Sequence, residues 1–126
     1  MIDFGWGDLD QTYLVVAFRD IWTSDQFVTM VATLSSNIRN ANQSVNCIID
    51  LRYSGVPPMS ILGAVTSAVR QRSNNLGRVI VVSQSNIWKR LYDAFIYKKQ
   101  DHLMDLIFVN SMDEAYPLIL AASSAS

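Results

Sequence analysis

The sequence predicts a single α/β domain in which about four helices flank a mostly parallel, five-stranded sheet. The first observation is an alternation along the chain. Continuous runs of β-branched and apolar residues are separated by segments with apolar residues at helical spacing. The second is that odd and even positions within these runs are both apolar, which is typical of strands covered on both faces. The expected order is β-β-α-β-α-β-α-β-α, and the 126 residues fit one domain that spans 1–126.

Four runs predict buried strands, because β-branched and apolar residues follow one another without interruption. They occupy residues 13–18, 45–51, 79–82 and 106–109. A weaker strand is expected at residues 2–6, followed by Gly and Asp residues that are typical of a turn. This first strand is expected to form a hairpin with its successor across residues 7–11.

Each helical segment follows a serine or asparagine that can accept a hydrogen bond at the helix start. The apolar stripes begin after Ser24, after Ser60, after Ser85 or Asn86, and after Ser111. Ser111 and Glu114 have the spacing of a Ser-x-x-Glu capping box. Pro117 lies about a turn and a half into the last helix, so we expect a kink or a late start there. Residues 122–126 are expected to be a frayed tail.

Composition excludes several classes of protein. Charged residues make up 17% of the chain and the formal net charge is -1, which argues against a nucleic-acid binder. The single cysteine, Cys47, cannot form an internal disulfide or a thiolate metal site. The start of the chain has no secretory signal, and no apolar run approaches the ~20 residues of a membrane span. We therefore expect no integral membrane segment and a cytoplasmic location.

The segment after residue 51 has the most informative pattern. A buried strand ends near Asp50, a Gly- and Pro-rich loop follows, and Ser60 stands where a helix should begin. Open parallel sheets bind ligands at the carboxyl ends of their strands, and helix N-termini favour anions. Ser60 therefore has two interpretations. It is either an N-cap worth about 1 kcal/mol or a functional hydroxyl at which a phosphate would be stabilised. The serines that precede the other helices are expected to be N-caps alone.

Other side chains capable of chemistry have structural interpretations. Asp50 is expected to accept backbone N–H bonds from the following turn, and Cys47 to be a buried, inert thiol. His102 has no partner motif and is expected to be an exposed loop histidine. Asp8 and Asp10 lack the further oxygen ligands of a calcium loop. We therefore predict no catalytic residue, no metal site and no cofactor.

The order of elements, together with residues 48–51, Ser60 and Gly63, resembles the STAS domain. This is the fold of anti-sigma-factor antagonists and of the cytoplasmic tails of sulfate transporters. In the antagonists, an Asp-Ser-Ser/Thr-Gly motif opens the second helix, and a partner kinase phosphorylates its second Ser or Thr. The resemblance implies that Ser60 is the phosphoacceptor. Where the family motif has Asp, Ser and Gly, this chain carries Pro58, Met59 and Ile61.

We expect a divergent, stand-alone STAS-like domain, and residues 22–27 resemble the first-helix opening of such bacterial proteins. The resemblance implies a non-enzymatic, regulatory role through protein–protein contact. A regulatory kinase or another signalling protein is the expected partner. The candidate interaction surface comprises Arg52, Tyr53, Ser54, Met59, Ser60 and Gly63.

Two alternatives remain open. A small-ligand or lipid-binding module belongs to the same broad fold class, and an apolar cavity would favour it. An enzyme is disfavoured, because the sequence has no nucleophile–base or metal constellation. Strands that are apolar on both faces need cover on both faces, which also predicts a homodimer.

Overall fold

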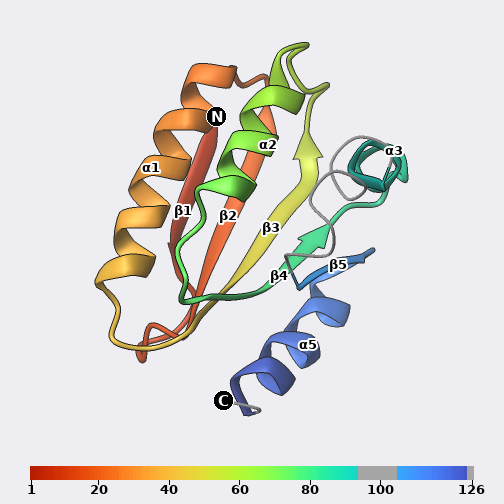
Figure 1. Cartoon of the computed structure of the whole chain (residues 1–126). Coiled ribbons are helices and arrows are strands. Elements are labelled where there is room, and N and C mark those ends of the chain that lie inside the picture. Colours follow the sequence, from red (N-terminus) through yellow and green to blue (C-terminus); the bar gives the residue numbers. More distant parts are fainter. Residues whose placement is uncertain (94–104, 125–126) are drawn as a thin grey trace.

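The computed structural model describes residues 1–93 and 105–124 of the chain. Its strands are β1 (Ile2–Trp6), β2 (Tyr13–Asp20), β3 (Val45–Ser54), β4 (Leu76–Val82) and β5 (Leu106–Val109). Its helices are α1 (Ser24–Asn40), α2 (Ile61–Arg70), α3 (Ile87–Leu91) and α5 (Met112–Ser124). Strands and helices follow one another in the expected order (Figure 1).

The five strands form one sheet in the order β1-β2-β3-β4-β5. β1 pairs antiparallel with β2, in a register that places Trp6 opposite Leu14. The other neighbours, β2–β3, β3–β4 and β4–β5, are parallel. The predicted fold class and the predicted hairpin are therefore confirmed. Because β2 and β3 are parallel, the segments that follow them leave the sheet at the same edge.

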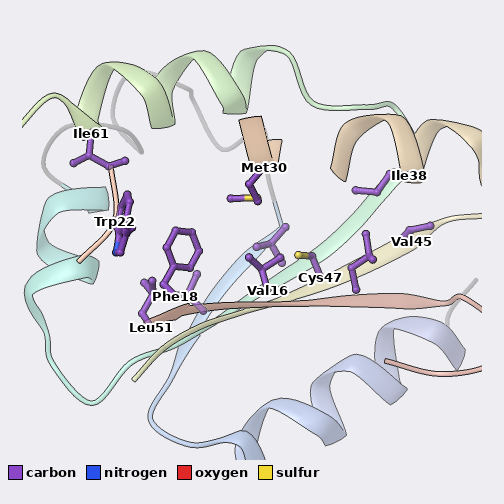
Figure 2. Packing of buried hydrophobic residues seen from close by; sticks show 12 residues of the cluster. Val16, Phe18, Trp22, Met30, Ile38, Val45, Cys47, Leu51 and Ile61 are labelled. Atoms are coloured by element: carbon purple, nitrogen blue, oxygen red, sulfur yellow. The ribbon is translucent and has the colours of Figure 1, made fainter. Parts of the chain in front are cut away.

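Helices cover both faces of the sheet, with α1 and α2 on one face and α5 on the other (Figure 1). Neighbouring residues of β3 show the two-sided burial directly. Cys47 belongs to the core under α1 and α2, and Ile48 belongs to the core under α5. In Figure 2, Val16 of the sheet lies below Met30 and Ile61, which come from α1 and α2. This packing fixes the N-termini of both helices near the carboxyl edge of β2 and β3.

The helix starts differ in detail from the expected ones. Thr23, not Ser24, caps α1: its side chain accepts from the Gln26 backbone N–H, and the Gln26 side chain accepts from the Thr23 N–H. α5 begins at Met112, so Pro117 lies inside the helix and does not delay its start. The helix continues to Ser124, into the segment expected to fray.

Strand β3 is longer than expected, because its polar end is paired. Tyr53 and Ser54 lie opposite Arg19 and Asp20 of β2, and these partners extend the strand beyond residue 51. The expectation that Arg52, Tyr53 and Ser54 belong to a loop is therefore wrong. The loop between β3 and α2 covers only residues 55–60.

Candidate functional site

Ser60 lies where the sequence predicts it, at the start of a helix and exposed to solvent. It is the N-cap residue of α2, directly after the Gly- and Pro-rich loop that ends β3. Its hydroxyl, however, makes no capping hydrogen bond to the backbone of α2. The N-cap interpretation is therefore correct for the position of Ser60 and wrong for its side chain.

The Ser60 hydroxyl instead shares a hydrogen bond of 2.6 Å with the hydroxyl of Ser24, the first residue of α1. The positive ends of two helix dipoles therefore meet at one pair of hydroxyl groups. Both residues lie where water can reach them, which leaves the pair accessible to a modifying enzyme or a partner.

Two further contacts hold the same two segments together. The Gly55 N–H donates to the Asp20 carbonyl at 2.8 Å, and Trp22 Nε1 donates to Ser54 Oγ at 2.8 Å. Gly55 is required here, because an added Cβ would lie 2.8 Å from the Asp20 carbonyl oxygen. Segments 20–24 and 54–60 therefore form one continuous edge of the molecule.

Asp50 and Arg52 form an ion pair beside this edge. Arg52 donates its backbone N–H and Nε to Asp50 Oδ1, both at 3.0 Å, and Nη2 to Oδ2 at 2.9 Å. One extra residue of β3, opposite the step from Ala17 to Arg19, forms a bulge that lets Arg52 fold back. Burial disfavours the charged form of Asp50, but the hydrogen bonds and charge of Arg52 outweigh it and lower the pKa of this carboxyl. Asp50 does accept a backbone N–H bond, as predicted, but the donor, Arg52, belongs to β3 and not to a following turn.

Large apolar side chains project into solvent from the two segments that hold Ser24 and Ser60, and from Tyr53 at the end of β3. Ile21 is 84% exposed, Val56 89% and Met59 101%, while Tyr53 is 61% exposed. We call these four residues the apolar rim. Soluble proteins seldom gather exposed apolar side chains at one place unless something binds there. The sequence indicated Tyr53 and Met59 but missed Ile21 and Val56, because their exposure depends on how the two loops lie together.

The remaining surface candidates divide into two groups. Arg52 and Ser54 are partly buried, and their side chains make the intramolecular contacts described above. They stabilise the edge and offer little side-chain surface to a partner. Gly63 lies exposed on α2, and an added Cβ would meet nothing within 4 Å. Gly63 therefore leaves the α2 surface next to Ser60 flat.

Other predicted residues have the structural roles expected of them. Burial raises the pKa of the Cys47 thiol to about 12, so this thiol is unreactive at neutral pH. Asp8 accepts hydrogen bonds from Thr12 within its own turn. Ser111 accepts from the Glu114 N–H, which supports the predicted cap of the last helix. The expectation for His102 lies outside the described residues.

Two solved structures have the same architecture over nearly the whole chain. One is an uncharacterized protein of the DUF3478 family with a SpoIIAA-like fold, from Shewanella loihica PV-4. It has a TM-score of 0.70 and 13% identity, over 94% of this chain and 93% of that chain. The other is an anti-sigma factor antagonist from Mycobacterium paratuberculosis, with a TM-score of 0.61 and 16% identity, over 95% of each chain. This chain has a STAS-like fold. No family model and no curated protein matches the sequence.

The STAS-like fold of this chain also contains an apolar cavity. It has a volume of about 210 Å³ and lies between the sheet and the helices α1, α2 and α3. Its walls include Val16 and Val81 of the sheet and Ile61 of α2. Along the described part of the chain, no helix is both long and apolar enough to cross a bilayer.

Proposed function

We propose that this protein is a non-enzymatic, STAS-like regulatory domain that binds a protein partner through the edge formed by segments 20–24 and 54–60. The observation that carries the proposal is the apolar rim: Ile21, Val56 and Met59 project into solvent from the two segments that hold Ser24 and the exposed Ser60, and Tyr53 from the adjoining end of β3. Each side chain would gain free energy by leaving water, at about 25 cal/mol per Å² of apolar surface. A partner with an apolar docking surface, such as a regulatory kinase or another signalling protein, fits this edge.

Ser60 is the proposed switch within this edge. A phosphate on its hydroxyl would add about -1.5 to -2 charges and three acceptor oxygens. The N-termini of α1 and α2 would both stabilise that charge, because Ser24 and Ser60 bring them together. The fold would therefore tolerate the modification, while the apolar rim beside it would become strongly anionic. A partner docked on the rim should then dissociate.

The experiment is a pull-down with the tagged protein from a lysate of its own organism, followed by affinity measurements on the recovered partner. Met59→Ser and Val56→Ser should each weaken binding about tenfold, because each removes roughly 1.4 kcal/mol of apolar contact. Leu9→Ser is the matched control, since Leu9 is 102% exposed but lies in the turn between β1 and β2.

The switch is tested with Ser60→Asp in the same binding assay. This variant places an anion at both helix N-termini and should leave stability nearly unchanged while partner binding is lost. Ser67→Asp, at an exposed position later in α2, is the control for added charge. If Ser60→Asp and the rim variants bind every recovered partner as tightly as the unmodified protein, the proposed function is wrong.

A second candidate function is a small-ligand or lipid-binding module. The specific observation in its favour is the apolar cavity between the sheet and the helices. This cavity and the apolar rim occupy different places, so one function does not exclude the other.

A further inference from the structure

Strand β1 forms one edge of the sheet, and its outer side is open. Within the described residues, β1 pairs with β2 alone. Proteins ordinarily protect such an edge with lysines, prolines or a bulge, because unpaired backbone groups recruit other strands. β1 has none of these: its sequence is Ile-Asp-Phe-Gly-Trp, and its register with β2 is regular. The edge is therefore available to a further strand.

The pairing with β2 determines which backbone groups of β1 face outward. Met1 and Arg19 are hydrogen-bonded in both directions, at 2.9 and 2.8 Å. Hydrogen-bonded and non-bonded pairs alternate in an antiparallel ladder, so every second residue from Met1 onward bonds to β2. The residues between them direct their N–H and C=O groups to the open edge; they are Ile2, Phe4 and Trp6. An added strand would meet three donors and three acceptors there.

A groove beside the edge can receive the side chains of such a strand. α1 runs alongside β1 (Figure 1), and the walls of the open groove between them include Ile2 and Phe4 of β1 and Asp25 and Thr29 of α1. Residues that lie opposite each other in paired strands place their side chains on the same face. The residues of an added strand that lie opposite Ile2 and Phe4 would therefore enter the groove. The residue between them would lie beside Asp3, on the other face.

The charges along this edge are negative. Asp3 and Asp25 are exposed, and neither forms an ion pair with a residue in the described part of the chain. A basic side chain in the groove would approach Asp25, and a basic side chain on the other face would approach Asp3. A second copy of β1 contains no base and would add another Asp3, so it lacks this complementarity.

We propose that β1 binds an extended, basic segment of a partner protein by strand addition. Main-chain hydrogen bonds along the open edge supply the affinity, and the two carboxylates select positive charge. These residues are different from those of the apolar rim. The proposal therefore does not depend on the function proposed above.

The probe is a fluorescently labelled peptide, Val-Thr-Val-Lys-Lys, blocked at both ends. Antiparallel to β1, it places its valines opposite Trp6 and Phe4 and its lysines opposite Asp3 and Ile2. Fluorescence anisotropy should show saturable binding. The same peptide with N-methyl groups on both valines has the same side-chain order but lacks two backbone donors. It should bind at least about tenfold more weakly.

Phe4→Pro tests the edge itself, because proline removes an N–H that points away from β2. It should bind the peptide at least about tenfold more weakly than Phe4→Ala, which loses the same side chain and keeps the N–H. Asp3→Asn and Asp25→Asn should each weaken binding about twofold to fivefold, the range for an exposed ion pair. Asp10→Asn, at an exposed position between β1 and β2, is the control for these two variants.

No binding of the peptide, or equal binding of its N-methylated form, would overturn the proposal. The N-methylated peptide needs no variant, so it decides the question if Phe4→Pro does not fold. Sedimentation equilibrium is the second measurement. A dimer that Phe4→Pro dissociates and Phe4→Ala retains would assign the edge to a second copy and also overturn the proposal. Met59→Ser should bind the peptide like the unmodified protein, which separates this test from that of the apolar rim.

Discussion

The side-chain hydroxyls of Ser24 and Ser60 lie 2.6 Å apart, although 36 positions separate the two residues in the sequence. The contact joins the first residue of α1 to the N-cap of α2. It replaces the capping bond that a serine in the position of Ser60 ordinarily makes. The starts of the two helices therefore behave as one polar unit at the carboxyl edge of the sheet.

Replacement of either serine by alanine should lower the free energy of unfolding by about 0.5–1 kcal/mol, the lower range for a hydrogen bond, because the site is exposed. The double variant Ser24→Ala, Ser60→Ala should cost little more than one single variant, since both changes remove the same contact. Urea denaturation of the three variants measures this coupling. Additive losses would show that the two hydroxyls act independently.

Gly55 and Gly63 should respond oppositely to alanine. Gly55→Ala places a Cβ 2.8 Å from the Asp20 carbonyl oxygen and should destabilise the protein by about 1–3 kcal/mol. Gly63→Ala meets no atom within 4 Å and should stabilise α2 by about 0.5–1 kcal/mol. Thermal melts of the two variants provide the comparison. Similar melting temperatures would mean that the Asp20–Gly55 contact is not tight in solution.

Asp50 should make stability depend on acid pH. Its pKa in the folded protein is below the ordinary value of 3.8, because Arg52 outweighs the effect of burial. The unfolded chain therefore takes up the proton first. This contribution is complete above pH 3.8 and is lost as the pH falls through the folded-state pKa.

Asp50→Asn should remove that part of the acid dependence and cost about 1.5–3 kcal/mol at neutral pH, the range for hydrogen bonds to charged groups. Urea denaturation between neutral and strongly acid pH measures both effects. Asp3→Asn, at an exposed position of β1, is the control. If the free energy of unfolding of Asp50→Asn falls with acid pH as steeply as that of the unmodified protein, the ion pair does not form in solution.

We also predict a homodimer. α5 packs over β3, β4 and β5, whereas Val15 and Ala17 of β2 remain only half-buried. A second copy of the chain would cover this apolar strip, and Ala17→Lys should then produce monomers. Sedimentation equilibrium over a range of concentrations measures the association. A monomer at the highest concentration would contradict the prediction.

Much of the fold is predictable from the sequence because it depends on local patterns. Apolar runs and helical stripes give the element order, and the break at residues 55–58 gives the start of α2 at Ile61. The end of β3 is not predictable in this way. Tyr53 and Ser54 are extended because Arg19 and Asp20 pair with them, and no nearby residue signals that pairing.

The site is predictable in position but not in construction. The loop pattern places Ser60 correctly, whereas its bond to Ser24 and the bond from Trp22 to Ser54 depend on the packing of two distant segments. The cavity is also invisible in the sequence, because an apolar residue that lines an empty space has the same pattern as one that is fully packed.

Trp22 lies between two binding sites proposed for this protein, the apolar rim and the apolar cavity. Its ring lines the cavity, and its neighbour Ile21 belongs to the apolar rim; likewise, Ile61 lines the cavity directly after Ser60. A molecule in the cavity that shifts Trp22 or Ile61 enough to move Ile21 or Ser60 would alter the affinity of the rim for the proposed partner. Thermodynamic reciprocity then requires the partner to alter the affinity of the cavity by the same factor. If both proposals hold, occupancy of the cavity and occupancy of the rim are therefore thermodynamically coupled.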